Sequence, residues 1–333
     1  MDRMNFTHAV ARLRVIEKRL LDKIKIERMV ESSSLEEAIK ILQETQYGDN
    51  ISLLKRNEDY ELLLNEELKR LYSLMYEISP EKLIVDIMSL KYDYHNIKVL
   101  KKSEILGGDL SSLLIPIGTV DIDKLKNSMV TNELKELEPI MREAIVKVQE
   151  NYAESKDSQS LDIILDNYIY KHMIAKAEES NFDFVIDFIK KSIDLTNIKT
   201  MIRVKLQNKD IRFLESTLLD NGNIPRELFI QGLNDNLESF SNKIAKYGYE
   251  AVLKALIEEY QSSNKYNSLE VYSDNYLMSF IKNAKRINFG PEPIIAYIMA
   301  KETEIKVIRI ILAGKLNKVD SSIIRERLRD IYA

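Results

Sequence analysis

Turn-forming residues are scarce in this chain, and their scarcity constrains the fold more than any other feature. The 9 Gly and 6 Pro together make 15 of 333 residues, under 5% where average usage is roughly 12%. With so few residues that form turns at low cost, most of the length must lie in long, uninterrupted elements. Apolar residues make up 45% and charged residues 31% of the chain. We therefore predict a folded, all-α protein; β-sandwiches, Gly-looped nucleotide folds and disordered chains are poor candidates.

The net charge argues against a nucleic-acid partner, and the cysteine content against disulfides and thiolate metal sites. Lys and Arg number 49 against 53 Asp and Glu, a net charge of −4, whereas a duplex-binding protein needs a basic surplus to displace counterions. We therefore expect no nucleic-acid partner. The absence of Cys excludes disulfides and thiolate metal sites. The first residues lack the apolar core of a signal peptide, and no stretch approaches the roughly 20 apolar residues that span a bilayer. We expect a cytosolic chain, unless a partner holds it at a membrane.

The chain contains an internal repeat of about a hundred residues. A shift of 101 positions places Asp86, Asp93, Asn96, Lys98 and Asp109 on Asp187, Asp194, Asn197, Lys199 and Asp210. A fainter third copy has Glu304-Ile305-Lys306 where the first two have Asn96-Ile97-Lys98 and Asn197-Ile198-Lys199. Each copy predicts a long helix, a connector and a short helix, the last expected at 122–127, 226–230 and 321–331. Asp121 and Asp320 are expected to cap their short helices, and Pro225 to occupy a first turn.

The repeat predicts three helical units without flexible linkers between them. We place them at residues 1–130, with an extra N-terminal helix, 131–232 and 233–333. A period near 100 residues exceeds that of simple solenoids, so three copies suggest a body with pseudo-threefold symmetry. Pro80 is expected in the first turn of the first long helix. In the third, only Lys306 and Arg309 interrupt the apolar residues from Ile305 to Leu312, so this helix should be buried nearly all round.

Residues that carry out catalysis or hold metals are scarce. His8, His95 and His172 lie far apart and no two share the i, i+4 spacing of a helical zinc site. No P-loop is present, and the pairs of adjacent carboxylates do not face each other on a helix. We predict no catalytic residue, no cofactor or metal, and no small-molecule substrate.

The Asn-Ile-Lys motif of the first two copies is open to two interpretations. In the structural one, Ile is core, Lys is solvated, and Asn, which is disfavoured within helices, bonds to a neighbouring helix. In the functional one, Lys98, Lys199 and Lys306 line one cavity.

Several blocks of the chain, in the same order, resemble the C subunit of the bacterial and archaeal V/A-type rotary ATPases, the counterpart of the d subunit of the eukaryotic V-ATPase. The blocks begin with Ala9-Val10-Ala11-Arg12, Tyr94-His95-Asn96-Ile97-Lys98, Asp194-Leu195-Thr196-Asn197-Ile198-Lys199, Pro291-Glu292-Pro293-Ile294 and Ala300-Lys301-Glu302-Thr303-Glu304-Ile305-Lys306. The resemblance covers essentially the whole chain.

This resemblance implies a funnel-shaped protein with a central cavity that receives the tip of the rotor axle, formed by the D and F subunits. It implies one copy per complex, held by protein partners on the cytoplasmic face of the membrane proteolipid ring. The protein would perform no bond chemistry and would transmit torque for ATP-coupled ion transport, with ion selectivity residing elsewhere in the complex. The alternative is a free-standing all-helical scaffold or interaction protein.

We further expect the repeated helices to converge around the pseudo-threefold axis, with their cations meeting acidic side chains of the axle. The predicted partner-binding residues are Asn96, Lys98, Asn197, Lys199, Arg203, Lys306 and Arg309.

Overall fold

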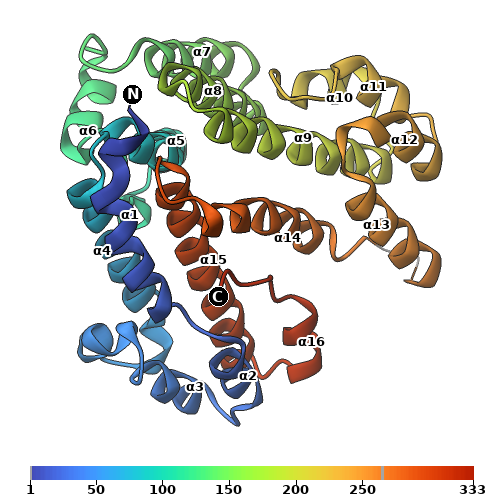
Figure 1. Cartoon of the computed structure of the whole chain (residues 1–333). Coiled ribbons are helices and arrows are strands. Elements are labelled where there is room, and N and C mark those ends of the chain that lie inside the picture. The colour runs from blue at the N-terminus through green and yellow to red at the C-terminus, as the bar shows by residue number, and fades with distance from the viewer. Residues whose placement is uncertain (1, 264–265) are drawn as a thin grey trace. The chain divides into compact units, whose positions relative to one another are not determined.

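Every regular element of the protein is a helix in the part of the chain that the structure describes, residues 2–263 and 266–333 of a computed structural model (Figure 1). The all-α prediction is thus confirmed. The chain packs as two compact units, which we call the terminal unit (Met1–Val85 with Lys254–Ala333) and the middle unit (Asp86–Leu253). The three units expected at 1–130, 131–232 and 233–333 are defined by sequence repetition rather than by packing, and stay a prediction.

The terminal unit is built around one buried helix, α15. Its α-helices are α1 (Thr7–Ile16), α2 (Lys23–Glu31), α3 (Leu35–Leu42), α4 (Tyr60–Ile78), α14 (Leu269–Ile281), α15 (Glu292–Leu316) and α16 (Ser321–Glu326). Helices α1, α3, α4 and α14 all pack against α15, and Figure 1 shows α15 running alongside α4. The apolar residues Ile294–Ile298, Ile305, Val307, Ile308, Ile311 and Leu312 are all buried. The prediction of a helix buried nearly all round is confirmed.

The middle unit contains the other two long repeated helices, α5 and α9. Its α-helices are α5 (Lys82–Leu106, whose first turn belongs to the terminal unit), α6 (Ile122–Thr131), α7 (Pro139–Ser155), α8 (Ser158–Ser180), α9 (Asp183–Leu206), α10 (Ile211–Thr217), α11 (Arg226–Gly232), α12 (Leu237–Ile244) and α13 (Glu250–Ser263), which crosses into the terminal unit. Helix α8 packs between α7 and α9 (Figure 1). Tyr94 and Ile97 of α5 join a core with Met141, Ile145 and Leu161 of α7 and α8.

Short 3-10 helices link several of these elements. They are η1 (Arg3–Phe6), η2 (Glu17–Arg19), η3 (Gln46–Leu53), η4 (Asn57–Asp59), η5 (Ser111–Leu113), η6 (Ala245–Tyr247) and η7 (Lys282–Arg286).

Helix ends follow the predicted caps at two of three short helices. Asp121 accepts hydrogen bonds from the first turn of α6, and Asp320 from that of α16. The first-turn placement of Pro225 is wrong: Pro225 is the N-cap of α11, with the non-helical ψ of 139° that a cap adopts. Pro80 likewise lies before α5, which begins at Lys82. Helix α16 ends at Glu326 rather than near 331, because the irregular chain beyond it carries Ile331 into the core.

Candidate functional site

The middle unit has two connectors: the first lies between α5 and α6, and the second between α10 and α11. Asn96 binds the first connector to α5, and Asn197 binds the second to α9. The Nδ2 of Asn96 donates to the carbonyl of Ile115 at 2.8 Å, and the amide of Ile115 donates back to Asn96 Oδ1 at 2.9 Å. The Nδ2 of Asn197 donates to the carbonyl of Leu219 at 2.9 Å, and the amide of Leu219 donates to Asn197 Oδ1 at 2.8 Å. The expected hydrogen bond exists, but its partner is connector backbone rather than a neighbouring helix. An amide side chain suits this because it both donates and accepts.

Asp93 and Asp194, three residues earlier, hold the same connectors at a second point. Asp93 accepts from the amide and hydroxyl of Thr119, both at 2.8 Å, and from the amide of Val120 at 3.0 Å. Asp194 accepts from the amide and side chain of Asn223 at 3.1 and 3.0 Å, and from the amide of Ile224 at 3.0 Å. A spacing of three residues places Asp and Asn on one helix face. We call each Asp–Asn pair, with the backbone it holds, a connector clamp.

Burial of the clamp has an electrostatic consequence at Asp93. The side chain is fully buried, and loss of hydration raises its pKa to about 6, although the hydrogen bonds from Thr119 and Val120 act in the opposite direction. A buried carboxylate is costly unless hydrogen bonds replace its water. The three donors of the connector supply that replacement.

The third copy of the motif uses different residues and holds a different segment. A shift of 107 positions places Lys301 and Glu304 where Asp194 and Asn197 lie, and both are buried. Lys301 Nζ lies 2.6 Å from Glu304 Oε1 and 2.8 Å from Glu67 Oε1. Glu304 also accepts from the amide of Leu21 and from the hydroxyl of Tyr47. The third copy therefore holds the N-terminal region of the chain through an ionic cluster.

The cluster around Lys301 is electrically balanced. Arg70 binds both carboxylate oxygens of Glu67 at 2.7 Å, so two cations face the two anions Glu67 and Glu304. Balanced, hydrogen-bonded charges are tolerated in an interior, whereas removal of one partner leaves an uncompensated buried charge.

Each copy of the motif also contacts the unit that follows it in the predicted division. The hydroxyl of Tyr94 lies 3.3 Å from His172 Nδ1 on α8, and His172 Nε2 lies 2.8 Å from Glu138. The hydroxyl of Tyr249 donates to Asp194 at 2.6 Å. The contacts of the third copy return to residues 21, 47 and 67. Burial lowers the pKa of His172, with Glu138 opposing the shift.

The predicted partner-binding cations are divided between the two units. In the middle unit Lys98 Nζ lies 3.2 Å from both Asp162 and Asp166, Lys199 is half-buried and Arg203 is exposed. Burial disfavours the charged form of Lys98, but the two aspartates outweigh it and raise its pKa. In the terminal unit, Lys306 pairs with Asp274 at 2.5 Å and Arg309 with Glu61 at 2.9 Å. That these cations meet a partner stays a prediction.

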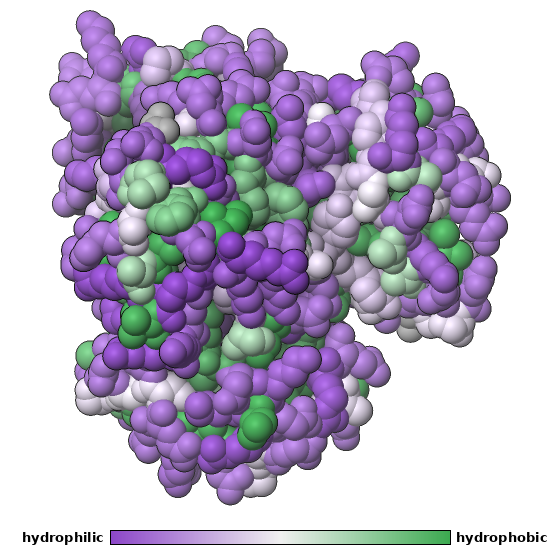
Figure 2. Space-filling model, viewed as in Figure 1, coloured by the Kyte–Doolittle hydropathy of each residue, from purple (hydrophilic) through white to green (hydrophobic). Residues whose placement is uncertain are grey.

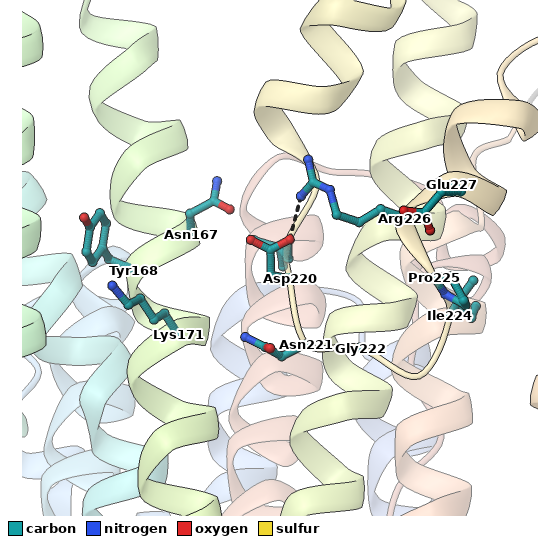
Figure 3. Close-up of a pocket in the computed structure, with 11 residues that line it drawn as sticks. Asn167, Tyr168, Lys171, Asp220, Asn221, Gly222, Ile224, Pro225, Arg226 and Glu227 are labelled. Carbon is teal, nitrogen blue, oxygen red and sulfur yellow. Dashed lines mark hydrogen bonds and ion pairs between the residues drawn. The ribbon is translucent and has the colours of Figure 1, made fainter.

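A cavity of about 710 Å³ lies between α8 and the second connector (Figure 3). In Figure 3, Tyr168 and Lys171 of α8 stand opposite Asp220 of the second connector and Arg226, the first residue of α11. Lys171 pairs with Glu143 and Arg226 with Asp220, both at 2.8 Å. The lining includes no Ser, His or Cys, so it offers none of the usual nucleophiles of acyl transfer.

Neither a metal site nor a membrane span is formed by the described residues. Over residues 2–263 and 266–333, no three His, Cys, Asp or Glu side chains group as a metal site would require. None of the helices in these ranges has the apolar length needed for a bilayer crossing.

A family model described as ATP synthase (C/AC39) subunit matches residues 9–327. The chain belongs to this family. It is 32% identical over 313 residues to the C subunit of the V-type sodium ATPase of Enterococcus hirae, covering 94% of each chain. It is 28% identical over 352 residues to the C subunit of the A-type ATP synthase of Methanocaldococcus jannaschii, covering 98% of this chain and 87% of the relative. The family predicted from the motif blocks is confirmed.

In this C/AC39 family member, sequence reasoning missed the residues that complete the clamps. The 101-residue shift aligns Asp93 with Asp194, but the sequence pattern alone assigns no role to either residue. The signal that could have found them is joint recurrence: an Asp three residues before each Asn, and a Gly in each connector, Gly118 and Gly222.

Proposed function

We propose that this protein is a non-catalytic central-stalk component of a V/A-type ATPase or ATP synthase. It acts as a socket between the rotor axle, formed by the D and F subunits, and the membrane proteolipid ring, and transmits torque for ATP-coupled ion transport. One copy per complex sits on the cytoplasmic face, held by protein partners. Membership of the ATP synthase (C/AC39) subunit family supports this role, as do relatives named as the C subunits of such complexes.

The observation that carries the proposal is the pair of connector clamps. A part that transmits torque must resist bending, and loops are ordinarily its most mobile segments. Here each connector of the middle unit is hydrogen-bonded to a long helix at two points. Asn96 and Asp93 hold the first connector, and Asn197 and Asp194 hold the second. Buried side-chain hydrogen bonds of this kind rigidify the segments they join.

We further propose a closed, funnel-shaped arrangement of the three units 1–130, 131–232 and 233–333 around a pseudo-threefold axis and a central cavity. The contacts from each motif copy to the next unit support closure, since those of the third copy return to Leu21, Tyr47 and Glu67. Contacts that pass from unit to unit and return to the first are what a cyclic arrangement requires.

The cations of the repeated helices are proposed to face the axle. Lys98, Lys199, Arg203, Lys306 and Arg309 would line the cavity and attract acidic side chains of D and F. Asn96 and Asn197 would act there by holding the connectors in place. Charge complementarity of this kind mainly steers association and fixes register.

The test measures binding of the purified chain to purified D/F at low salt. Lys199→Glu/Arg203→Glu is expected to weaken binding on the order of tenfold. The matched control, Lys135→Glu/Lys147→Glu, reverses two exposed charges and should bind as the unmodified chain does. Unchanged binding in the first variant would remove the residue assignment. An unmodified chain that binds neither D/F nor the proteolipid ring would remove the coupling role in favour of a free-standing scaffold.

A further inference from the structure

Three segments of the terminal unit meet around Glu17. Arg14 donates to Glu17 at 2.9 Å and also to the carbonyls of Ala284 and Ile287, at 2.8 and 2.7 Å. The hydroxyl of Tyr332 lies 3.4 Å from Glu17, and Lys285 Nζ lies 4.6 Å from the centre of the Tyr332 ring. These contacts bring η2, η7 and the segment after α16 together.

Positive charge at this junction is not compensated. Glu17 is already neutralised by Arg14. Five further cations lie on η2 and η7 and make no ion pair with any described residue: Lys18, Arg19, Lys282, Lys285 and Arg286. Burial lowers the pKa of Lys285, and the nearby Lys282 and Arg14 lower it further, while Glu17 opposes the shift, as expected where like charges outnumber the opposite charge.

Some exposed cations of the same unit are compensated. Arg12 pairs with Glu77, and Arg28 with Glu44. The junction is distinguished by five cations, unpaired among the described residues, on two short helices, η2 and η7, which the hydrogen bonds of Arg14 bring together.

Exposed apolar side chains flank these cations. Val15 at the end of α1 is 61% exposed, Ile24 at the start of α2 is 73% exposed, and Phe289 after η7 is 44% exposed. Figure 2 shows apolar residues standing among hydrophilic ones on the drawn face. Cations interspersed with exposed aliphatic and aromatic side chains are typical of surfaces that bind the headgroup layer of a bilayer. The cations attract anionic lipids, while the apolar side chains reach the acyl boundary.

We propose that this basic patch, formed by Lys18, Arg19, Lys282, Lys285 and Arg286 with Val15, Ile24 and Phe289, binds the surface of an anionic bilayer. Charge attraction makes the binding salt-sensitive, because it is screened beyond about 10 Å at 0.1 M salt. An acidic protein surface would attract the same cations, and the vesicle and polyglutamate measurements below distinguish it from a bilayer. The inference does not rest on the coupling role, since the patch needs neither the axle nor the ring.

The experiment is flotation of the purified full-length chain with lipid vesicles. Vesicles of phosphatidylcholine alone are compared with vesicles containing about 30% phosphatidylglycerol, at about 0.05 M and about 0.5 M NaCl. Binding is expected at least tenfold stronger to the anionic vesicles at low salt, and lost at high salt. Lys282→Glu/Lys285→Glu/Arg286→Glu should lower it at least tenfold.

Matched variants distinguish an effect of the basic patch from an effect of the change in net charge. Lys55→Glu/Lys135→Glu/Lys147→Glu makes the same charge change at exposed sites elsewhere and should bind as the unmodified chain does. Ile24→Ser leaves the charge unchanged and should still weaken binding several-fold. Lys18→Gln/Arg19→Gln serves if the triple variant fails to fold, as judged by circular dichroism. Equal binding to both vesicle types, or equal loss in the control, overturns the proposal. So does binding of polyglutamate without binding of vesicles, which would assign the patch to an acidic protein.

Discussion

Gly118 lies against the carboxylate of Asp93, so closely that a Cβ on Gly118 would fall 2.0 Å from Asp93 Oδ1. The same relationship recurs one repeat later, where a Cβ on Gly222 would fall 2.3 Å from Asp194 Oδ1. Neither glycine has a positive φ. Their role is therefore to let the connector backbone approach the carboxylate.

We expect Gly118→Ala to destabilise the protein by about 2–3 kcal/mol, because the added methyl must displace a buried, hydrogen-bonded carboxylate. Urea unfolding measures the change. Gly108→Ala is the matched control, since no atom lies within 4 Å of its built Cβ, and should change stability by less than about 1 kcal/mol. Equal effects of the two substitutions would contradict the close-approach argument.

Asn96→Ala and Asn197→Ala should each cost about 1–3 kcal/mol, because each removes two hydrogen bonds and leaves backbone groups without a partner, part-buried at Ile115 and buried at Leu219. Hydrogen exchange followed by NMR locates the effect. Asn96→Ala should speed exchange of the Ile115 amide and leave that of Leu219 unchanged, and Asn197→Ala should do the reverse. The variants thus serve as controls for each other, and acceleration at neither amide would refute the clamp.

Lys301→Met should destabilise by about 3–5 kcal/mol, because it leaves Glu67 and Glu304 without their shared cation in the interior. Lys306→Met, five residues along the same helix, is the control. Lys306 is 43% exposed and pairs with Asp274, so its loss should cost less than about 1 kcal/mol. Chemical denaturation compares the two, and similar costs would show that the Lys301 cluster is not what holds the N-terminal region.

The contribution of His172 to stability should fall as the pH drops below about 6.5, the ordinary pKa of histidine. Because the pKa of His172 is lowered by burial, the unfolded chain binds more protons than the folded one in this range, and protonation favours unfolding. His172→Gln should flatten this part of the curve of unfolding free energy against pH. An unchanged slope in the variant would assign the acid sensitivity to other groups.

Asp93 should change stability with pH in the direction opposite to His172, between about pH 4 and pH 6. Its pKa is raised from 3.8 to about 6, so the folded chain binds more protons here and its contribution to stability declines as the pH rises. The shift of about two units corresponds to about 3 kcal/mol. Asp93→Asn should remove this pH dependence while lowering stability at every pH, because its NH₂ group faces amide donors. Thermal unfolding at several pH values distinguishes the two slopes, and parallel curves would contradict the shift.

The helices and most of their caps were predictable from sequence because they depend on neighbours within a few residues. Asp121 caps α6 as expected, and the apolar spacing from Ile305 to Leu312 predicted a buried helix. Pro225 was misplaced by one residue because a proline suits both the N-cap and the first turn by its fixed φ. Only the ψ of 139° distinguishes the two positions.

The sequence by itself determined that the protein is all-α and that it belongs to the ATP synthase (C/AC39) subunit family, since breaker scarcity, periodicity and motif order are properties of the linear chain. Its division into three repeated units stays a prediction. The tertiary structure alone decided what the repeated polar residues hold. The partners of Asn96 and Asn197 are backbone groups, which carry no side-chain signature. Glu304 meets Leu21 across 283 positions of the chain. Only folding brings such groups together. Burial then strengthens their hydrogen bonds and ion pairs, and makes the loss of a partner costly to stability.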